Sequence, residues 1–245
     1  MLILIPVLLA SFIPAIIIYA AVRKIGGDRP DYRADCTRAL IYGLLSPLAV
    51  VLAAGILQIL GNLAGLKKCP VLIREAYTNF ILHSLVEEVA KFLFLLMVLK
   101  KAKSNYSWRD VTAFMVIVGI GFGLPEDVLY LIGSDVVQIL VRGLLLMHGG
   151  YAFIMGYFYG KALYTGKKGY KVIAILLPFL LHGIYDFGLV PELLELNDNL
   201  AFISISMALV GVVVLIRLIV FFARSGEKEK YISPLKQVSL DNQSE

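Results

Sequence analysis

Hydrophobic residues fill most of this chain in long runs, which are separated by short polar and charged stretches. Seven of the runs are about 20 residues long, the length that an α-helix needs to cross a hydrocarbon core of about 30 Å. The pattern predicts an all-α integral membrane protein, a polytopic bundle of about seven transmembrane helices. The seven runs are approximately residues 1–22, 39–64, 77–99, 111–133, 137–160, 172–190 and 200–223.

The overall composition agrees with this pattern. Hydrophobic residues make up 59% of the chain and the mean hydropathy is +0.82, whereas a soluble domain is about half apolar. The first run lacks a basic start and a small-residue cleavage site before Arg23, so we expect a retained helix and not a removed signal peptide. The lipid bilayer is therefore the expected surrounding, and the expected location is a cell membrane that the chain crosses several times.

Basic residues collect in every second connection between the runs. These connections carry five, four, four and four Lys or Arg, at residues 23–38, 100–110, 161–171 and in the tail from residue 224. The intervening connections hold only Lys67, Lys68 and Arg74. Because Lys and Arg are enriched on the cytoplasmic side, this distribution predicts an N-terminus outside and a C-terminus inside. It also accounts for the net charge of +5 without nucleic acid as a partner.

The same pattern divides the chain into two parts. Residues 1–224 form the expected transmembrane helical domain, and its catalytic core is expected at residues 77–190. Residues 225–245 mix charges with Ser, Asn, Gln and Pro. Such a composition is typical of a disordered segment, here a cytoplasmic tail.

The third run contains ionisable residues near its middle, within the stretch His83-Ser-Leu-Val-Glu87-Glu88-Val-Ala-Lys91. An ionisable group at this depth costs at least about 2.5 kcal/mol unless it faces water, a partner or a metal. At α-helical spacing, Glu87 and Lys91 share one face, with His83 one turn earlier. This helix is therefore expected to present a polar stripe to the interior of the bundle, with Lys91 pairing with one of the two carboxylates.

The fourth run combines three glycines with a proline, at Gly119, Gly121, Gly123 and Pro125, just before Glu126. Such a combination favours a break or kink in the helix, which would expose free N–H groups near this carboxylate. Broken helices at membrane depth usually line cavities.

The fifth and sixth runs carry His148 and the pair His182 and Asp186, which lie one helical turn apart. Arg142, also in the fifth run, is expected to be a counter-charge for the carboxylates or an interface anchor. Counting about 1.5 Å per helical residue places the ionisable groups of runs three to six in the outer half of the bundle. These groups are Glu87, Glu88, Glu126, His148, His182 and Asp186.

These residue types suit hydrolysis. A glutamate can take a proton from water, and two histidines with a carboxylate can hold Zn²⁺ while leaving a position open for that water. Asp186 is placed to orient the ring of His182. In the metal-free alternative, the Glu87 and Glu88 pair alone does this work.

Two other functions stay open. Chains of Asp, Glu and His also mark ion or proton transporters, although no inverted repeat is visible. A non-catalytic membrane scaffold is the third hypothesis. The motifs H-E-x-x-H and G-x-S-x-G do not occur, and the G-x-G-D partner of a Tyr-Asp pair is missing.

Four blocks in these runs resemble the PrsW family of intramembrane proteases, which is distantly similar to the CAAX-prenyl protease and bacteriocin-processing group. The blocks are Glu87-Glu88-x-x-Lys91, Phe122-x-x-x-Glu126 with Tyr130, His148 running to Gly156-Tyr157, and His182-x-x-x-Asp186. The resemblance implies an intramembrane endopeptidase, of metalloprotease or glutamate protease type, in the plasma membrane of a prokaryote. It would make the first, extracytoplasmic cut in a single-span substrate such as an anti-sigma factor.

The resemblance also implies roles for individual residues. Glu87 or Glu88 would activate water, and Asp186 would support His182. The metal, or else the oxyanion, would be bound by Glu126, His148 and His182.

Overall fold

The structure is a computed structural model that describes residues 4–26, 29–102, 105–130, 147–195 and 197, together with part of residues 199–220. All regular elements within these residues are helices, which confirms the all-α prediction. Three of the described helices are long and apolar enough to cross a membrane. They are Pro30–Leu63, Trp108–Leu129 and Lys168–Phe187.

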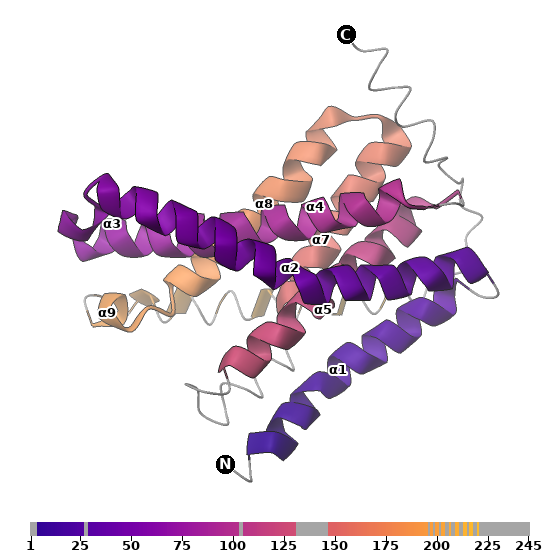
Figure 1. Ribbon diagram of the computed structural model, residues 1–245, viewed down its shortest axis with the longest axis horizontal. Coiled ribbons are helices and arrows are strands. Elements are labelled where there is room, and N and C mark those ends of the chain that lie inside the picture. The colour runs from indigo at the N-terminus through magenta and orange to yellow at the C-terminus, as the bar shows by residue number, and fades with distance from the viewer. Residues whose placement is uncertain are drawn as a thin grey trace.

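The first two helices are α1 (Leu4–Ile25) and α2 (Pro30–Leu63). Helix α2 begins at a proline, whose fixed φ suits the first position of a helix, and Arg29 before it is extended. The Tyr32 hydroxyl donates to the carbonyl of Val22 at 3.0 Å, which ties the start of α2 to the end of α1. From this joint α1 diverges from the rest of the molecule, whereas α2 runs across it (Figure 1).

The third predicted run, residues 77–99, is covered by two consecutive helical segments, and a short α-helix precedes them. After the short 3₁₀ turn η1 (Leu66–Lys68) come α3 (Val71–Ala76), the π-helix η2 (Tyr77–Leu85) and α4 (Val86–Lys100). The wider turns of a π-helix have i→i+5 hydrogen bonds and are frequent at functional sites. The sequence pattern did not predict this π-helix, which ends two residues before Glu87.

Helix α5 (Trp108–Tyr130) is the central helix of the fold. In an apolar stretch of 18 residues of α5, 72% is buried inside the molecule. The corresponding share is 17% in α2 and 22% in α8 (Lys168–Phe187). The first turn of α5 is capped in both directions, because Ser107 Oγ accepts the Asp110 N–H at 3.2 Å and Asp110 Oδ2 accepts the Ser107 N–H at 2.9 Å. This central position lets α5 pack against both α2 and α7 (Met147–Thr165).

The glycines of α5 serve helix packing. A Cβ at Gly119 would lie 2.3 Å from the Cβ of Ala152 and 2.6 Å from the carbonyl oxygen of His148. At Gly121 it would lie 3.1 Å from the Cα of Gly43. Of the predicted break or kink at this point, the break is wrong, since α5 is one helix that includes Pro125, and the kink stays a prediction. Small residues instead allow α2, α5 and α7 to approach closely, as is common between membrane helices.

Helices α7 and α8 form a hairpin, seen as the salmon-coloured pair in Figure 1, and the short helix α9 (Pro191–Leu194) follows α8. Gly166 in their connection has a φ of 70°, a left-handed conformation that favours glycine. Ser84 of η2 donates to the carbonyl of Phe179 at 2.6 Å, and a Cβ at Gly183 would meet the Phe80 ring at 2.4 Å. Helix α8 is thereby held against both α7 and the π-helix.

A polar network joins the start of α2 to the start of α5. Arg29 contacts both carboxylate oxygens of Asp110, at 2.8 and 3.0 Å, and Arg38 pairs with the buried Asp35. Burial raises the pKa of Tyr106 to about 12, so its hydroxyl stays protonated and donates to Asp35. The network fixes the start of α5 against α2.

The first six predicted runs each contain a helix. Residues 137–146 of the fifth run, most of the seventh run and the tail at residues 225–245 lie outside the described residues, as does Arg142. The number of seven spans, the orientation of the termini and the disordered tail therefore stay predictions.

Candidate functional site

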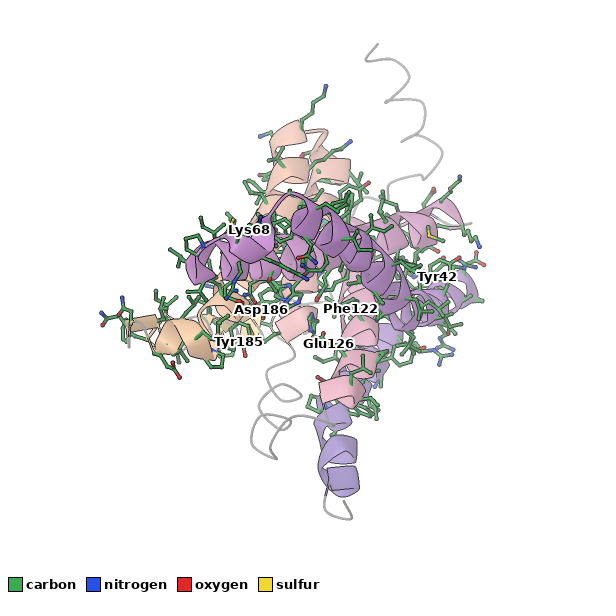
Figure 2. All side chains as sticks on the ribbon, turned by 60° about the vertical axis from the view of Figure 1, so that its left-hand side comes forward. Tyr42, Lys68, Phe122, Glu126, Tyr185 and Asp186 are labelled. Atoms are coloured by element: carbon green, nitrogen blue, oxygen red, sulfur yellow. The ribbon has the colours of Figure 1, made fainter. Side chains whose placement is uncertain are left out.

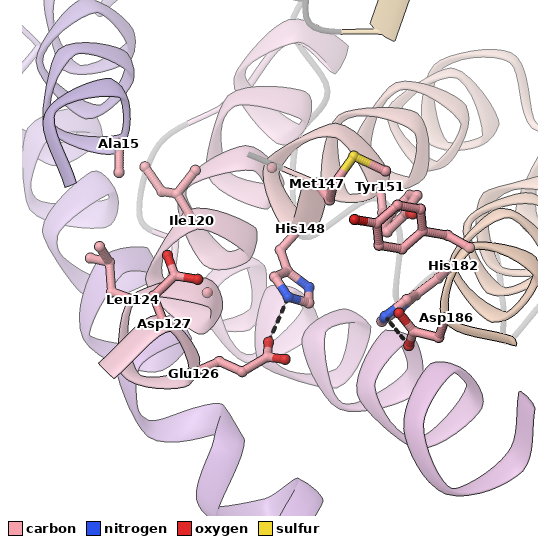
Figure 3. A pocket seen from close by; sticks show the side chains of 13 residues that line it. Ala15, Ile120, Leu124, Glu126, Asp127, Met147, His148, Tyr151, His182 and Asp186 are labelled. Atoms are coloured by element: carbon pink, nitrogen blue, oxygen red, sulfur yellow. Dashed lines mark ion pairs between the residues drawn. The ribbon is translucent and has the colours of Figure 1, made fainter. Parts of the chain in front are cut away.

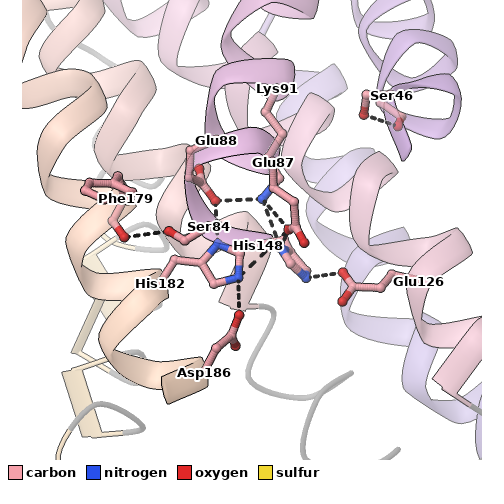
Figure 4. Close-up of polar contacts among 11 residues, drawn as sticks. Ser46, Ser84, Glu87, Glu88, Lys91, Glu126, His148, Phe179, His182 and Asp186 are labelled. Atoms are coloured by element: carbon pink, nitrogen blue, oxygen red, sulfur yellow. Dashed lines mark hydrogen bonds and ion pairs between the residues drawn. The ribbon is translucent and has the colours of Figure 1, made fainter. Parts of the chain in front are cut away.

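Helix α4 contributes two carboxylates and a lysine to a buried cluster. The Lys91 Nζ lies 2.7 Å from Glu88 Oε1 and 3.6 Å from Glu87 Oε2. Neither Lys91 nor Glu88 has any accessible side-chain surface. Lys91 thus pairs with both carboxylates and more closely with Glu88, which is three residues away (Figure 4).

Helix α8 brings His182 and Asp186 to the same cluster. The His182 Nδ1 lies 2.9 Å from Glu88 Oε1, and the Nε2 lies 3.1 Å from Asp186 Oδ2. The contact with Asp186 is the one that the i, i+4 spacing predicts. Both ring nitrogens face carboxylate oxygens, so the orientation of this ring is fixed from two sides.

Helices α7 and α5 complete the cluster with His148 and Glu126. The His148 Nδ1 lies 3.0 Å from Lys91 Nζ, and the Nε2 lies 2.5 Å from Glu126 Oε2. An ammonium group has only donors, so it donates to Nδ1, and the proton of the neutral ring is then on Nε2, facing Glu126. In Figure 2 Glu126 and Asp186, from different helices, lie toward the centre of the molecule.

Aromatic rings frame the two histidines. The Phe122 ring lies 5.0 Å from the His148 ring, centroid to centroid, and the Lys91 Nζ lies 4.3 Å from the Phe122 centroid. The Tyr151 ring stacks on His182 at 4.9 Å with an interplanar angle of 20°. The His148 and His182 rings meet edge to face at 5.4 Å. These contacts restrict the rotation of both imidazoles.

A pocket lies beside the two histidines (Figure 3). Its polar lining comes from α5, α7 and α8, and Ala15 of α1 also contributes. The ionisable side chains along it are Glu126, Asp127, His148, Tyr151, His182, Tyr185 and Asp186. The pocket therefore presents imidazoles and carboxylates to any molecule that enters it.

The donor groups also fit a metal ion. One ligand atom from each of Glu87, His148 and His182 can be chosen so that all lie within 4.8 Å of one another. Two histidines and a carboxylate match the catalytic zinc sites that keep a fourth position open for water. Glu126, which the sequence assigned to the metal, instead pairs with the Nε2 of His148.

The structure brings together all six residues singled out for the site: Glu87, Glu88, Glu126, His148, His182 and Asp186. The expectation that His83 shares the polar face is wrong, since its side chain is exposed. Its segment is π-helical, so the α-helical spacing used for that expectation does not apply.

Two further residues belong to the site. Lys91 was expected only to pair with a carboxylate, yet it contacts three side chains of the cluster. Tyr151 was not singled out, although it lies three residues from His148 and so shares a face of α7 with it.

Comparison with known proteins supports one family. The sequence profile of the PrsW family, described as intramembrane metalloproteases, matches residues 36–221. "Protease PrsW" of Clostridioides difficile (strain 630) is 31% identical over 126 residues, which cover 47% of this chain and 53% of that protein. The protein of the same name from Geobacillus kaustophilus (strain HTA426) is 28% identical over 172 residues, 67% of this chain and 72% of that protein.

The corresponding protein of Bacillus subtilis (strain 168) is 32% identical over 117 residues, 45% of this chain and 53% of that protein. The match thus spans about half the length of two of these three relatives. No solved structure matches the chain.

The fold and the site together define a helical membrane protein with a buried centre of carboxylates and imidazoles. The matching profile covers well over half of the sequence, and the chain belongs to the PrsW family.

Proposed function

We propose that this chain is an intramembrane endopeptidase that hydrolyses a peptide bond of a membrane-embedded substrate. The observation that carries the proposal is a cluster of side chains from four helices: Glu87, Glu88, Glu126, His148 and His182. Three of them, Glu126, His148 and His182, line one pocket. The expense of burying such groups at membrane depth makes a functional site the default interpretation. The name "Protease PrsW" of the relatives agrees with it.

Glu87 is the better candidate for the general base. The Oε1 of Glu88 already contacts both Lys91 and His182, at 2.7 and 2.9 Å. The Oε2 of Glu87 is buried and has no hydrogen bond within the described residues, and it lies 3.9 Å from a nitrogen of each histidine. A buried oxygen that makes no hydrogen bond within the described residues, next to two imidazoles and 3.6 Å from Lys91 Nζ, is suited to accept a proton from water.

In the proposed reaction the oxygen of a water molecule bonds to the carbonyl carbon of the scissile peptide, and Glu87 takes a proton from that water. The π electron pair of the carbonyl moves to its oxygen. When the tetrahedral intermediate collapses, the C–N bond breaks and Glu87 returns the proton to the leaving nitrogen. Lys91 and Glu88 hold Glu87 and the two histidines in place during these steps.

We further propose that the site holds Zn²⁺ through Glu87, His148 and His182, in place of the set Glu126, His148 and His182. When bound, the ion would supply Lewis acidity and lower the pKa of a water on it. Glu87 would then be a metal ligand, and its role as general base belongs to the metal-free alternative. Lys91 lies against two of these donors, so metal binding needs it to turn toward Glu88, its partner at 2.7 Å. In the metal-free alternative, Lys91 stays in place and supplies the positive charge.

For the substrate we propose a protein with a single membrane span, such as an anti-sigma factor, cut near the extracytoplasmic face. The support comes from the distribution of basic residues, which assigns the ionisable groups to the outer half of the bundle. The same distribution supports a multi-pass location in a prokaryotic plasma membrane, with the N-terminus outside and the C-terminus inside.

Cleavage of a library of single-span peptides by the purified protein in liposomes tests this proposal. Glu87→Gln, Glu88→Gln, His148→Ala and His182→Ala should each lower the rate by at least about 10²-fold, the size expected for loss of acid–base catalysis. The matched controls are His83→Ala and Glu192→Gln, because both side chains are exposed and outside the cluster. Unchanged cleavage in all four site variants would refute the proposal.

A second candidate function is proton transport. A continuous series of polar contacts, each between 2.5 and 3.1 Å, runs through the cluster, as in proton relays. In order, it joins Asp186, His182, Glu88, Lys91, His148 and Glu126. A pH gradient across the same liposomes distinguishes the two functions, since a protease should not dissipate it.

A further inference from the structure

The hydroxyl of Tyr151 is buried and has no hydrogen-bond partner among the described residues. The Tyr151 residue is 5% exposed, and no residue that the structure describes lies within hydrogen-bond distance of its oxygen in suitable geometry. Burying a hydroxyl in this way is costly, so such groups are normally paired in proteins. This unpaired donor lies in the lining of the pocket, together with His148, His182 and Asp186.

The packing of the ring does not explain the hydroxyl. Tyr151 stacks on His182 through its ring face, at 4.9 Å between centroids, and a phenylalanine would stack equally well. In the view of Figure 3 the hydroxyl is directed toward the His148 side of the pocket. The oxygen is therefore the part of this side chain that is left for a ligand.

The surrounding side chains indicate which kind of ligand group the Tyr151 hydroxyl would bind. A phenol can donate one hydrogen bond, and the cluster around it is rich in carboxylate oxygens that accept. None of the described carboxylates takes this donor. The hydroxyl is thus left to donate to an acceptor that enters the pocket.

Glu87 and Tyr151 both contact His182. The Oε2 of Glu87 lies 3.9 Å from His182 Nε2, at the edge of the ring, while Tyr151 covers its face. A peptide carbonyl next to His182 would have the proposed base on one side and the phenol on another. This is the arrangement that attack on a carbonyl needs, with a proton acceptor for the water and a donor for the oxygen.

We propose that Tyr151 is a catalytic residue that donates a hydrogen bond to the carbonyl oxygen of the scissile peptide as that oxygen becomes an oxyanion. The inference rests on the proposed endopeptidase function. Tyr151 keeps its proton throughout, so the bonds and protons balance as described for Glu87. The hydrogen bond strengthens as negative charge develops, and it therefore acts on the chemical step more than on substrate binding.

The test compares Tyr151→Phe with wild type in liposomes, using the library peptide that wild type cleaves fastest. Loss of one oxyanion donor costs about 10²–10³ in kcat, and KM should change little. Tyr164→Phe is the matched control, because this tyrosine lies on the same helix and is 44% exposed. The thermal unfolding midpoint of Tyr151→Phe should not fall, since the ring contact is kept.

A second measurement does not need turnover. A phosphinate peptide, whose anionic oxygens resemble those of the tetrahedral intermediate, should bind Tyr151→Phe about 10²-fold more weakly than wild type, in keeping with the loss in kcat. The matching uncleaved amide peptide should bind both proteins alike. Both affinities can be followed by calorimetry on the purified protein.

The two proposals fail in different ways. If wild type cleaves nothing but its phosphinate affinity depends on Tyr151, the endopeptidase function is wrong, and with it the role of Tyr151 in peptide cleavage, although Tyr151 is then shown to bind a tetrahedral anion. If Tyr151→Phe retains the phosphinate affinity of wild type, the inference about Tyr151 is overturned, whether or not wild type cleaves peptides. An unchanged kcat in a cleaving protein overturns it as well.

Discussion

Lys91 and Glu88 form an ion pair of 2.7 Å in which neither side chain has any accessible surface. Lys91→Met keeps the length of the apolar chain but leaves the carboxylate without its cation. Removing one partner of a buried pair costs about 3–5 kcal/mol. We expect the free energy of unfolding of Lys91→Met, measured by denaturant titration in mixed micelles, to fall by this amount.

The double variant Lys91→Met with Glu88→Gln should recover part of this loss, because no uncompensated charge is then buried. Lys100→Met is the matched control, since Lys100 is exposed at the end of the same helix, and its stability should stay within about 0.5 kcal/mol of wild type. A Lys91→Met protein as stable as wild type would show that the pair does not hold the cluster together.

The contact between α5 and α7 at Gly119 gives a second prediction. A Cβ here would lie 2.6 Å from the carbonyl oxygen of His148 and 2.3 Å from the Cβ of Ala152. Gly119→Ala should therefore push α7 away and displace His148. Overpacking of this kind costs about 1–3 kcal/mol, and cleavage should fall along with stability.

Gly55→Ala is the control for this substitution. A Cβ at Gly55 meets no atom within 4 Å, and this glycine also lies inside a helix. Alanine there should leave cleavage unchanged and stabilise the helix by up to about 1 kcal/mol. Equal behaviour of the two variants would mean that the approach at Gly119 is not tight.

The positions of the helices could be predicted because length and apolarity are local properties of the sequence. The π-helix could not, because it is held by contacts with a distant helix: Ser84 donates to the carbonyl of Phe179 at 2.6 Å, and Phe80 fits against Gly183. The proposed break before Glu126 failed for a similar reason. Gly119 and Gly121 suggested flexibility, but their small size serves contacts with α7 and α2.

The members of the site could also be predicted, but most of its pairings could not. His182 and Asp186 lie in one helix, so their spacing was sufficient. The pairing of Glu126 with His148, and of Glu88 with His182, depends on how four helices are rotated against one another. The choice of Glu87 over Glu126 as a metal donor likewise depends on those rotations.

Metal removal tests the proposed zinc site. We expect the purified protein to retain zinc, to lose cleavage on dialysis against a chelator and to recover it when zinc is restored. Loss of a residue that only hydrogen-bonds a metal ligand weakens metal binding by about 10–100-fold. His148→Ala and His182→Ala remove proposed ligands, so each should weaken zinc binding by more than this. The control His83→Ala, an exposed histidine, should bind zinc normally. Cleavage that survives complete metal removal would favour the metal-free mechanism.

The contact between His182 Nε2 and Asp186 Oδ2 at 3.1 Å gives the last prediction. Asp186→Asn keeps the size of the side chain but replaces the charged acceptor by an amide, so the ring is held less firmly. Loss of such an orienting partner costs about 10–100-fold in activity or metal affinity, less than loss of His182 itself.

Cleavage kinetics and zinc titration of Asp186→Asn measure this effect. The Asp186 side chain is 23% exposed, so the unfolding midpoint should change little. Glu192→Gln, which changes an exposed carboxylate in α9, should match wild type in all three measurements. An Asp186→Asn protein with full activity would mean that the other contact of the ring, Glu88 at 2.9 Å from Nδ1, is sufficient to orient His182.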